Sequence, residues 1–191
     1  MDEKTTLVLR RLEKFGQEHE GYWNIPPETG RFLHVLTVAM RAKSVLEVGT
    51  SNGYSTIWFA DALRTTAGKL TTFETNPDKV KMAQQAFQDA RVDSYITLRH
   101  ENAITALPKL AGPVDLAFLD AAKEEHLKYF QLAFPKVRPG GVLVSDNAIS
   151  HKTELKHFLN YVRKNGQGIW ETTLVPLGSG LEVTLKLREV R

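Results

Sequence analysis

Short runs of β-branched and apolar residues alternate with longer amphipathic runs along most of this 191-residue chain. Strands are predicted at residues 44–48, 69–74, 95–99, 114–120, 141–146, 170–176 and 181–188. Helices are predicted at residues 6–19, 30–42, 54–64, 78–90, 103–110, 124–137 and 153–164. This alternation is typical of parallel strands in a sheet that helices cover on both faces. Residues 114–119 and 142–144 are apolar enough to be buried central strands.

The end of the chain departs from this alternation. Only residues 177–180 separate the last two predicted strands, which is too short for a parallel crossover and predicts an antiparallel hairpin. We therefore expect an α/β fold: a doubly wound, Rossmann-like sheet of seven strands, mostly parallel, with a C-terminal antiparallel hairpin and helices on both faces. No repeat or linker divides the sequence, which predicts a single domain over residues 1–191, with residues 1–43 as an N-terminal helical cap region.

The composition excludes several classes of site and partner. The chain has no cysteine, so disulfides, thiolate metal sites and cysteine nucleophiles are excluded. No apolar run approaches the roughly 20 residues that span a bilayer. The charged start also lacks the apolar core of a signal peptide, so we expect a cytoplasmic protein without a membrane partner. The formal net charge is +3 and the basic residues are scattered. This permits a nucleic-acid substrate without favouring it over a mildly basic surface that has no partner.

Residues 45–56 (VLEVGTSNGYST) have the pattern of a buried strand, a glycine turn and the start of a helix. Such a turn presents free N–H groups at a helix N-terminus and lets a ligand approach the backbone closely. The spacing Gly49-x-x-x-Gly53 is not the G-x-G-x-x-G of nicotinamide and flavin binders. The turn is equally compatible with a tight strand–helix connection that binds nothing.

Two acidic residues indicate what this turn could bind. Glu74 ends the second predicted strand, 21 residues after Gly53, where an acidic side chain can accept hydrogen bonds from both ribose hydroxyls. Together with the glycine turn and the terminal hairpin, it favours S-adenosylmethionine over a dinucleotide. Glu47 adds negative charge on the first strand, which suits a ligand with an ammonium and a sulfonium group. Alternatively, Glu47 caps neighbouring backbone groups.

Polar side chains also follow the fourth and fifth predicted strands. Asp120 ends one strand and Asp146-Asn147 ends the next, and ligands of doubly wound sheets lie beyond such strand ends. These oxygen atoms suit Mg²⁺, Mn²⁺ or Ca²⁺ and not zinc, and two close carboxylates repel unless a cation lies between them. Each of these residues alone could instead cap a helix. Lys123 is placed to be a general base near such a cation, or is a solvated lysine at a helix start.

These segments resemble the class I S-adenosylmethionine-dependent O-methyltransferases, and more narrowly the cation-dependent branch that includes catechol and caffeoyl-CoA O-methyltransferases. The resemblance runs from about residue 30 to the C-terminus. Residues 45–56 resemble the cofactor loop, residues 72–78 (TFETNPD) the ribose-binding segment, and residues 118–123 (FLDAAK) the metal and base segment. Residues 139–147 (PGGVLVSDN) are the most specific piece, because Asp-Asn after that strand marks the cation-dependent branch.

The resemblance implies that residues in most of the matched segments contact the cofactor. Glu74 would bind the ribose, and Gly49 and Ser55 would contact the methionine part. Residues 101–104 (ENAI) approximately match the adenine-binding turn, but alanines at residues 121–122 replace the larger side chains expected beside adenine. The residues expected at the cofactor are Ile25, Glu47, Gly49, Gly53, Tyr54, Ser55, Glu74, Asn102, Ala103 and Asp120.

At the reacting end, the resemblance implies a cation site and an acceptor site. The residues that would hold the cation are Asp120, Asp146 and Asn147. Lys123 would be the base, and residues 23–30 (WNIPPETG) align with the segment that covers the methyl end of the cofactor, with Ile25 packed on it. The residues expected at the acceptor are Trp23, Asn147 and Glu182. Trp23 could equally belong to the core, and Glu182 could be an exposed strand residue.

We therefore expect a divalent-cation-dependent transfer of a methyl group from S-adenosylmethionine to one hydroxyl of a catechol-like small molecule, that is, a vicinal dihydroxy aromatic. Mg²⁺ is the first candidate for the cation. Two alternatives stay open: methylation of a hydroxylated base in tRNA, and a cofactor-binding module without catalysis. The apolar positions of residues 7–12 and 32–40 could form the face of a homodimer or could cover the sheet.

Overall fold

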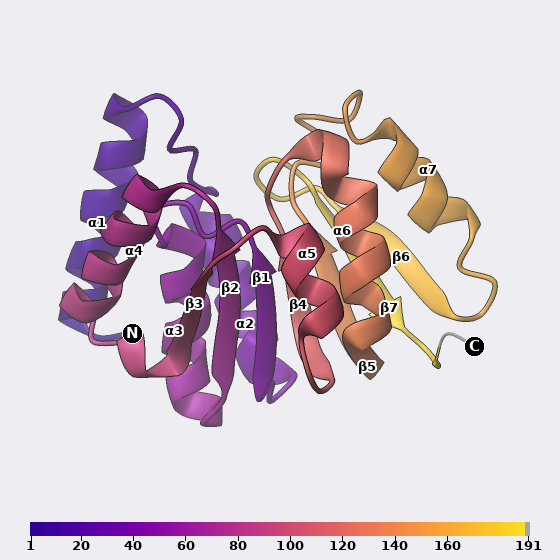
Figure 1. The fold of residues 1–191 in the computed structure, drawn as a ribbon, viewed down its shortest axis with the longest axis horizontal. Helices are drawn as coiled ribbons and strands as arrows, with labels where there is room; N and C mark the ends of the chain where they lie inside the picture. Colours follow the sequence, from indigo (N-terminus) through magenta and orange to yellow (C-terminus); the bar gives the residue numbers. More distant parts are fainter. Residues whose placement is uncertain (190–191) are drawn as a thin grey trace.

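A seven-stranded sheet forms the centre of the computed structural model, which describes residues 1–189 (Figure 1). Its strands are β1 (Ser44–Val48), β2 (Lys69–Glu74), β3 (Ile96–His100), β4 (Val114–Leu119), β5 (Val137–Ser145), β6 (Trp170–Val175) and β7 (Leu181–Lys186). Their order is β3-β2-β1-β4-β5-β7-β6. The first five strands pair in parallel, whereas β7 pairs antiparallel with both β5 and β6. The predicted fold class, with its C-terminal hairpin, is confirmed. Residues 190–191, the end of the predicted domain, lie outside the described residues.

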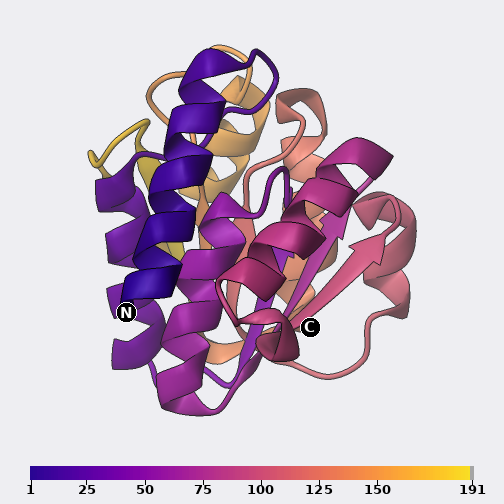
Figure 2. The ribbon, with the colours of Figure 1, turned by 90° about the vertical axis from the view of Figure 1, so that its left-hand side faces the viewer.

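Helices cover both faces of this sheet. They are α1 (Glu3–Glu18), α2 (Pro27–Ala39), α3 (Tyr54–Thr66), α4 (Pro77–Asp89), α5 (Ala103–Ala106), α6 (His126–Ala133) and α7 (Lys156–Lys164). Figures 1 and 2 show α1 to α4 on one face and α5 to α7 on the other. Side chains alternate along β4: Leu116 and Phe118 join the core under α1–α4, while Ala117 and Leu119 join the core under α5–α7. The apolar runs predicted as central strands are buried for this reason.

Helices α5 and α6 end earlier, and helix α7 begins later, than the sequence pattern predicts. Helix α5 ends at Ala106 and α6 at Ala133, and each continues as a 3₁₀ turn that contains a proline, Pro108 or Pro135. Proline has no backbone N–H to donate and clashes with the preceding turn, so the α-helical bonding stops there. Strand β5 also begins four residues earlier than predicted, at Val137, where its register against β4 is irregular.

The two N-terminal helices pack on the α3 side of the molecule. The Asp2 side chain accepts a hydrogen bond from Thr5 N at 2.8 Å and so caps α1. Helix α2 lies along α3, and α1 contacts both α3 and α4. The loop between α1 and α2, residues 19–26, leads from one helix to the other past the carboxyl ends of the strands. Among residues 1–189, no helix is long and apolar enough to cross a membrane.

The order of the sheet determines where a ligand can bind. Strand β1 is the first strand of the sheet, and β2 and β3 are added in turn on one side of it. Strand β4 then pairs with β1 on its other side. The connections leave this point toward opposite faces, which opens a crevice beyond the carboxyl ends of β1 and β4. The segments singled out from the sequence all begin at this edge.

Candidate active site

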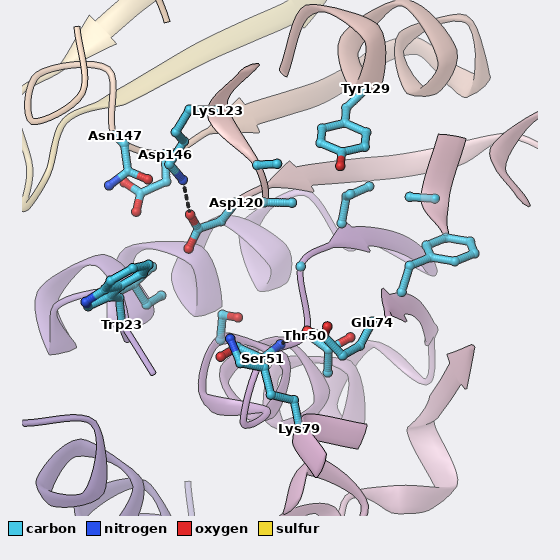
Figure 3. A pocket seen from close by; sticks show the side chains of 18 of the residues that line it. Trp23, Thr50, Ser51, Glu74, Lys79, Asp120, Lys123, Tyr129, Asp146 and Asn147 are labelled. Carbon is cyan, nitrogen blue, oxygen red and sulfur yellow. Dashed lines mark hydrogen bonds and ion pairs between the residues drawn. The ribbon is translucent and has the colours of Figure 1, made fainter. Parts of the chain in front are cut away.

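A cavity of about 890 Å³ lies at the carboxyl edge of the sheet (Figure 3). Its walls come from the segments that follow β1, β2, β4 and β5, and from residues 21–26 of the α1–α2 loop. The predicted residues that line it are Trp23, Ile25, Gly49, Tyr54, Ser55, Glu74, Asn102, Ala103, Asp120, Lys123, Asp146 and Asn147. The structure therefore gathers most of the predicted cofactor, cation and acceptor residues around one volume, which is large enough for a cofactor and a small second ligand.

The turn after β1 needs both of its glycines. Gly49 has φ +105°, and a Cβ there would lie 2.1 Å from the backbone oxygen of Asp120. Gly53 has φ +90°, and a Cβ there would meet the Phe87 ring at 2.6 Å. These backbone conformations are open to glycine and strained for other residues. Gly49 lines the cavity, whereas Gly53 does not, so Gly53 shapes the turn without facing a ligand.

Glu47 lies directly beneath this turn. It is fully buried and accepts hydrogen bonds from Ser55 Oγ at 2.6 Å, Thr56 Oγ1 at 2.6 Å and Thr72 Oγ1 at 2.7 Å. Burial raises the pKa of Glu47 to about 7, against the opposing effect of these three hydroxyls. Glu47 is not a lining residue, and its influence on a ligand passes through Ser55, which is. The predicted direct contact of Glu47 with the cofactor is replaced by support from below.

Glu74 stands where the sequence places a ribose-binding acid. Its Oε2 accepts a hydrogen bond from Ser51 N at 2.9 Å, and its Oε1 accepts from Thr75 N at 2.8 Å and Asn76 N at 2.9 Å. These bonds fix the carboxylate at the cavity wall. A carboxylate has about four acceptor sites, so capacity is left for a ligand hydroxyl.

Another part of the cavity wall contains two predicted residues, Asn102 and Ala103, and two that the sequence does not single out, Phe73 and Tyr129. Asn102 caps α5 by accepting a hydrogen bond from Ile104 N at 2.8 Å, and Ala103 follows it. Phe73 from β2 and Tyr129 from α6 line the cavity beside them. The Tyr129 hydroxyl donates to Glu125, and burial raises its pKa above the ordinary value. Phe73 and Tyr129 add aromatic surface to the cavity wall, which only their three-dimensional placement reveals.

The strand-end acids converge at the other end of the cavity. Lys123 Nζ donates to Asp120 Oδ1 at 2.9 Å (Figure 3). Asp146 is 2 % exposed and accepts from the Ser179 hydroxyl. Burial, and then the charge of Asp120, raise the pKa of Asp146 to about 6. The two acids and the lysine predicted at this edge therefore all line one cavity, and the charge of Asp120 acts on Asp146.

Asn147 completes this oxygen cluster. Its φ is +66°, and its Nδ2 donates to Ser150 Oγ at 3.2 Å, while its Oδ1 is buried and has no hydrogen-bond partner among residues 1–189. In the described part of the chain, no three His, Cys, Asp or Glu side chains are grouped to hold a metal ion. The Asn147 amide could supply a third protein oxygen beside Asp120 and Asp146.

The remaining predicted residues of the cavity wall are Trp23, Ile25 and Tyr54. The Trp23 side chain is 83 % exposed, so the alternative that it belongs to the core is wrong. Ile25 is 4 % exposed and lines the cavity wall. Tyr54 also lines the cavity, and its hydroxyl donates to Glu13 Oε1 of α1 at 2.5 Å.

Glu182 is the predicted site residue that the structure places elsewhere. It is fully buried in β7, and Arg163 of α7 donates to its two oxygens at 3.0 and 2.6 Å. Thr172 Oγ1 donates to it as well, at 3.1 Å. Glu182 does not line the cavity, and its burial rules out the alternative of an exposed strand residue, whereas its contact with an acceptor stays a prediction. Its carboxylate is committed to holding α7 on the sheet.

Comparisons with known proteins agree with this geometry. Residues 2–159 match the family model described as O-methyltransferase. The chain is 42 % identical over 130 residues to a catechol O-methyltransferase of Niastella koreensis (66 % of this chain, 58 % of the relative). It is 39 % identical over 126 residues to a catechol O-methyltransferase of Mycobacterium tuberculosis (65 % of this chain, 57 % of the relative). The matches thus span less than two thirds of the length of these relatives.

A solved structure resembles the whole described fold. It is that of the O-methyltransferase TomG from Streptomyces achromogenes, in complex with SAM, which superposes with a TM-score of 0.82 at 26 % identity. The similarity covers 98 % of this chain and 91 % of TomG. Strands β6 and β7, which lie beyond the region matched by the family model, therefore also have a counterpart in a solved methyltransferase structure.

Proposed function

This chain belongs to the O-methyltransferase family, and on that premise we propose that it transfers a methyl group from S-adenosylmethionine to one hydroxyl of a vicinal dihydroxy aromatic molecule, with the help of a divalent cation. The observation that carries the proposal is the cluster of Asp120, Asp146 and Asn147 in the same cavity as Glu74 and the glycine turn. One end of the cavity suits a nucleoside and the other an oxygen-rich acceptor.

Three properties of the cluster fit a divalent cation. Its donor atoms are all oxygens, as Mg²⁺ prefers. The Asn147 Oδ1 is buried without a partner, which is unfavourable for a polar atom unless a ligand satisfies it. Burial, and then the charge of Asp120, raise the pKa of Asp146, and a cation beside the two acids would relieve the repulsion between them. When bound, a divalent cation supplies Lewis-acid polarisation that favours the ionised form of a nearby hydroxyl.

Lys123 is the residue that we propose as the base. Its amine lies 2.9 Å from Asp120 and lines the cavity, within the oxygen cluster. In its neutral form the amine takes the proton of the attacking hydroxyl and becomes an ammonium, while the hydroxyl oxygen forms a bond to the methyl carbon. The bond from that carbon to sulfur breaks and its electron pair stays on sulfur, so the sulfonium becomes a neutral thioether. An anion and a cation neutralise each other in this step, which a partly desolvated cavity favours over water.

The acceptor is held by contacts that differ from those of the cofactor. The exposed ring of Trp23 stands at the cavity beside Asp120 and Asn147 (Figure 3), where it offers an apolar face to an aromatic acceptor. The Asn147 amide contributes an orienting polar contact. Two adjacent hydroxyls on one ring match this pairing of an aromatic face with an oxygen-binding cluster.

Methyl transfer from labelled S-adenosylmethionine tests the proposal directly. Catechol, phenol, a catechol that is already methylated once and unmodified tRNA are supplied as acceptors in parallel with added Mg²⁺. We expect labelling of catechol at least tenfold above phenol, because only a vicinal diol presents two oxygens to the cluster. The Lys123→Met variant should lose about 10²-fold or more in turnover, in keeping with loss of a general base. Labelling of tRNA with none of catechol would overturn the assignment of a small aromatic acceptor.

A further inference from the structure

The α1–α2 loop (residues 19–26) forms one wall of the cavity. Five of its residues, Gly21, Trp23, Asn24, Ile25 and Pro26, line the cavity although they lie far in sequence from the strand-end segments. At its α1 side, the loop is fixed by Asn24 Nδ2, which donates to Leu12 O at 2.8 Å. A Cβ at Gly16 would lie 2.6 Å from the backbone oxygen of Tyr22, so the loop packs closely on α1 there.

The same loop also contacts Lys79 of α4. This residue is in the first turn of α4, which begins three residues after Glu74. Its Nζ donates to Gly21 O at 2.7 Å and lies 5.2 Å from the centre of the Tyr22 ring. Lys79 itself lines the cavity. Figure 3 shows the end of its side chain on the same side of the cavity as Trp23, with Tyr129 on the far side.

These two contacts give Lys79 a place in the cavity wall that its sequence position does not suggest. The loop comes from the N-terminal helices, and α4 follows the strand that ends in the ribose-binding Glu74. The Lys79 contact therefore joins two segments of the cavity wall that lie 58 residues apart in the sequence. A nucleoside ligand held by Glu74 can leave past this side only if the loop separates from α4.

We propose that Lys79 is a positioning residue that holds the α1–α2 loop against α4 and so retains S-adenosylmethionine and its demethylated product in the cavity. The inference rests on the cofactor occupying this cavity and not on the identity of the acceptor or of the cation. The strength of this contact suits a loop that must also open to let the cofactor enter and its product leave. A charge-assisted hydrogen bond to a backbone oxygen, with a cation over an aromatic ring, shifts the closed population by a modest factor and leaves the open form accessible.

The test compares three variants at two lysines of the same helix. Lys79→Met keeps most of the side-chain stem but removes the donor and the charge. Lys79→Arg restores both, since a guanidinium can donate to Gly21 O and stack on the Tyr22 ring. Lys81→Met makes the same exchange at an exposed position two residues on and serves as the control.

The measurement is the dissociation rate of S-adenosylhomocysteine, followed by stopped-flow protein fluorescence, with the KM for S-adenosylmethionine and the melting temperature measured in parallel. For Lys79→Met we expect about three- to tenfold faster dissociation and a matching rise in KM, with the melting temperature unchanged. Lys79→Arg should return within about twofold of the wild type, and Lys81→Met should equal it.

Equal dissociation rates in Lys79→Met and Lys81→Met would overturn the inference, and so would an arginine variant as fast as the methionine variant. A fall in melting temperature without a change in dissociation would show a purely structural contact and would also overturn it. A wild-type chain that binds no S-adenosylhomocysteine would reject the cofactor site on which the inference rests. Normal binding with unchanged release from Lys79→Met rejects the positioning role alone.

Discussion

At the scale of single residues, the cavity depends on a backbone that only glycine can follow. Gly49 brings the turn after β1 against the backbone of Asp120, so the cofactor turn and the cation cluster are in direct contact. The same residue therefore controls the distance between the two ends of the proposed reaction. Gly112 also has a positive φ, of +75°, but no atom lies within 4 Å of the Cβ position there.

Alanine variants of these two glycines distinguish the cost of backbone strain from the cost of a steric clash. Gly112→Ala should lower the free energy of unfolding by about 1–2 kcal/mol, which is the strain of an L-residue in the left-handed region. Gly49→Ala adds a collision with the Asp120 backbone and should lower it by about 3 kcal/mol or more, with loss of S-adenosylhomocysteine binding. Chemical denaturation and calorimetric titration measure the two effects. Equal destabilisation of both variants, with binding retained by Gly49→Ala, would contradict the close approach.

A buried histidine makes stability depend on pH. His126 is fully buried against the Phe158 ring, and neither of its ring nitrogens has a partner among the described residues. Burial lowers its pKa from 6.5 to about 3. The unfolded chain therefore binds a proton below pH 6.5 that the folded chain excludes. The stability contributed by neutral His126 is full above pH 6.5 and is lost as the pH falls toward 3, by up to about 1.4 kcal/mol per pH unit.

The exchange His126→Phe tests this effect. The variant keeps a ring against Phe158, so it should gain stability relative to the wild type as the pH falls from 6.5 to 4, with the gap widening steadily. Urea denaturation at four or five pH values measures it. The exchange His157→Phe at an exposed position of α7 is the control and should show no widening gap. A constant difference between His126→Phe and the wild type would show that the imidazole is not excluded from protonation.

At the scale of elements, α7 is attached to the C-terminal hairpin by charge. Arg163 holds the fully buried Glu182 of β7 through two hydrogen bonds, and Trp170 Nε1 donates to Val162 O of the same helix at 2.8 Å. A buried carboxylate that loses its partner is strongly destabilising. Glu182 thus helps to hold α7 on the sheet.

Removal of this pair should affect stability far more than activity. Arg163→Met should lower the free energy of unfolding by about 2–3 kcal/mol, less than for a fully buried pair because the Arg163 side chain is 38 % exposed. The double variant Arg163→Met/Glu182→Met should recover most of that loss. The KM for a catechol acceptor should change less than twofold in the double variant. A tenfold rise in that KM with intact stability would return Glu182 to the acceptor site.

At the scale of the whole molecule, the sequence predicts what depends on local pattern and misses what depends on distant contacts. Glu74, Asp120 and Asp146 could be predicted because each follows a recognisable strand, and parallel strands end at one edge. Tyr129 and Lys79 reach the cavity from helices whose rotation and tilt the pattern does not fix. Glu182 shows the same limit: the sequence places it on the last strand, but only the packing of α7 shows that Arg163 is its partner.

The central claim for the molecule is that Asp120, Asp146 and Asn147 form one oxygen site that a divalent cation must occupy for methyl transfer. Its most direct test is the rate of catechol methylation by chelator-treated protein as Mg²⁺ is added back. The wild type should be inactive without the ion and should regain its rate along a saturating curve, whereas Asp146→Ala should remain about 10²- to 10³-fold slower at every concentration. Glu154→Gln, an exposed acid elsewhere, should follow the wild-type curve. Full turnover by the wild type in the presence of chelator, or an Asp146→Ala curve equal to that of the wild type, would contradict the claim.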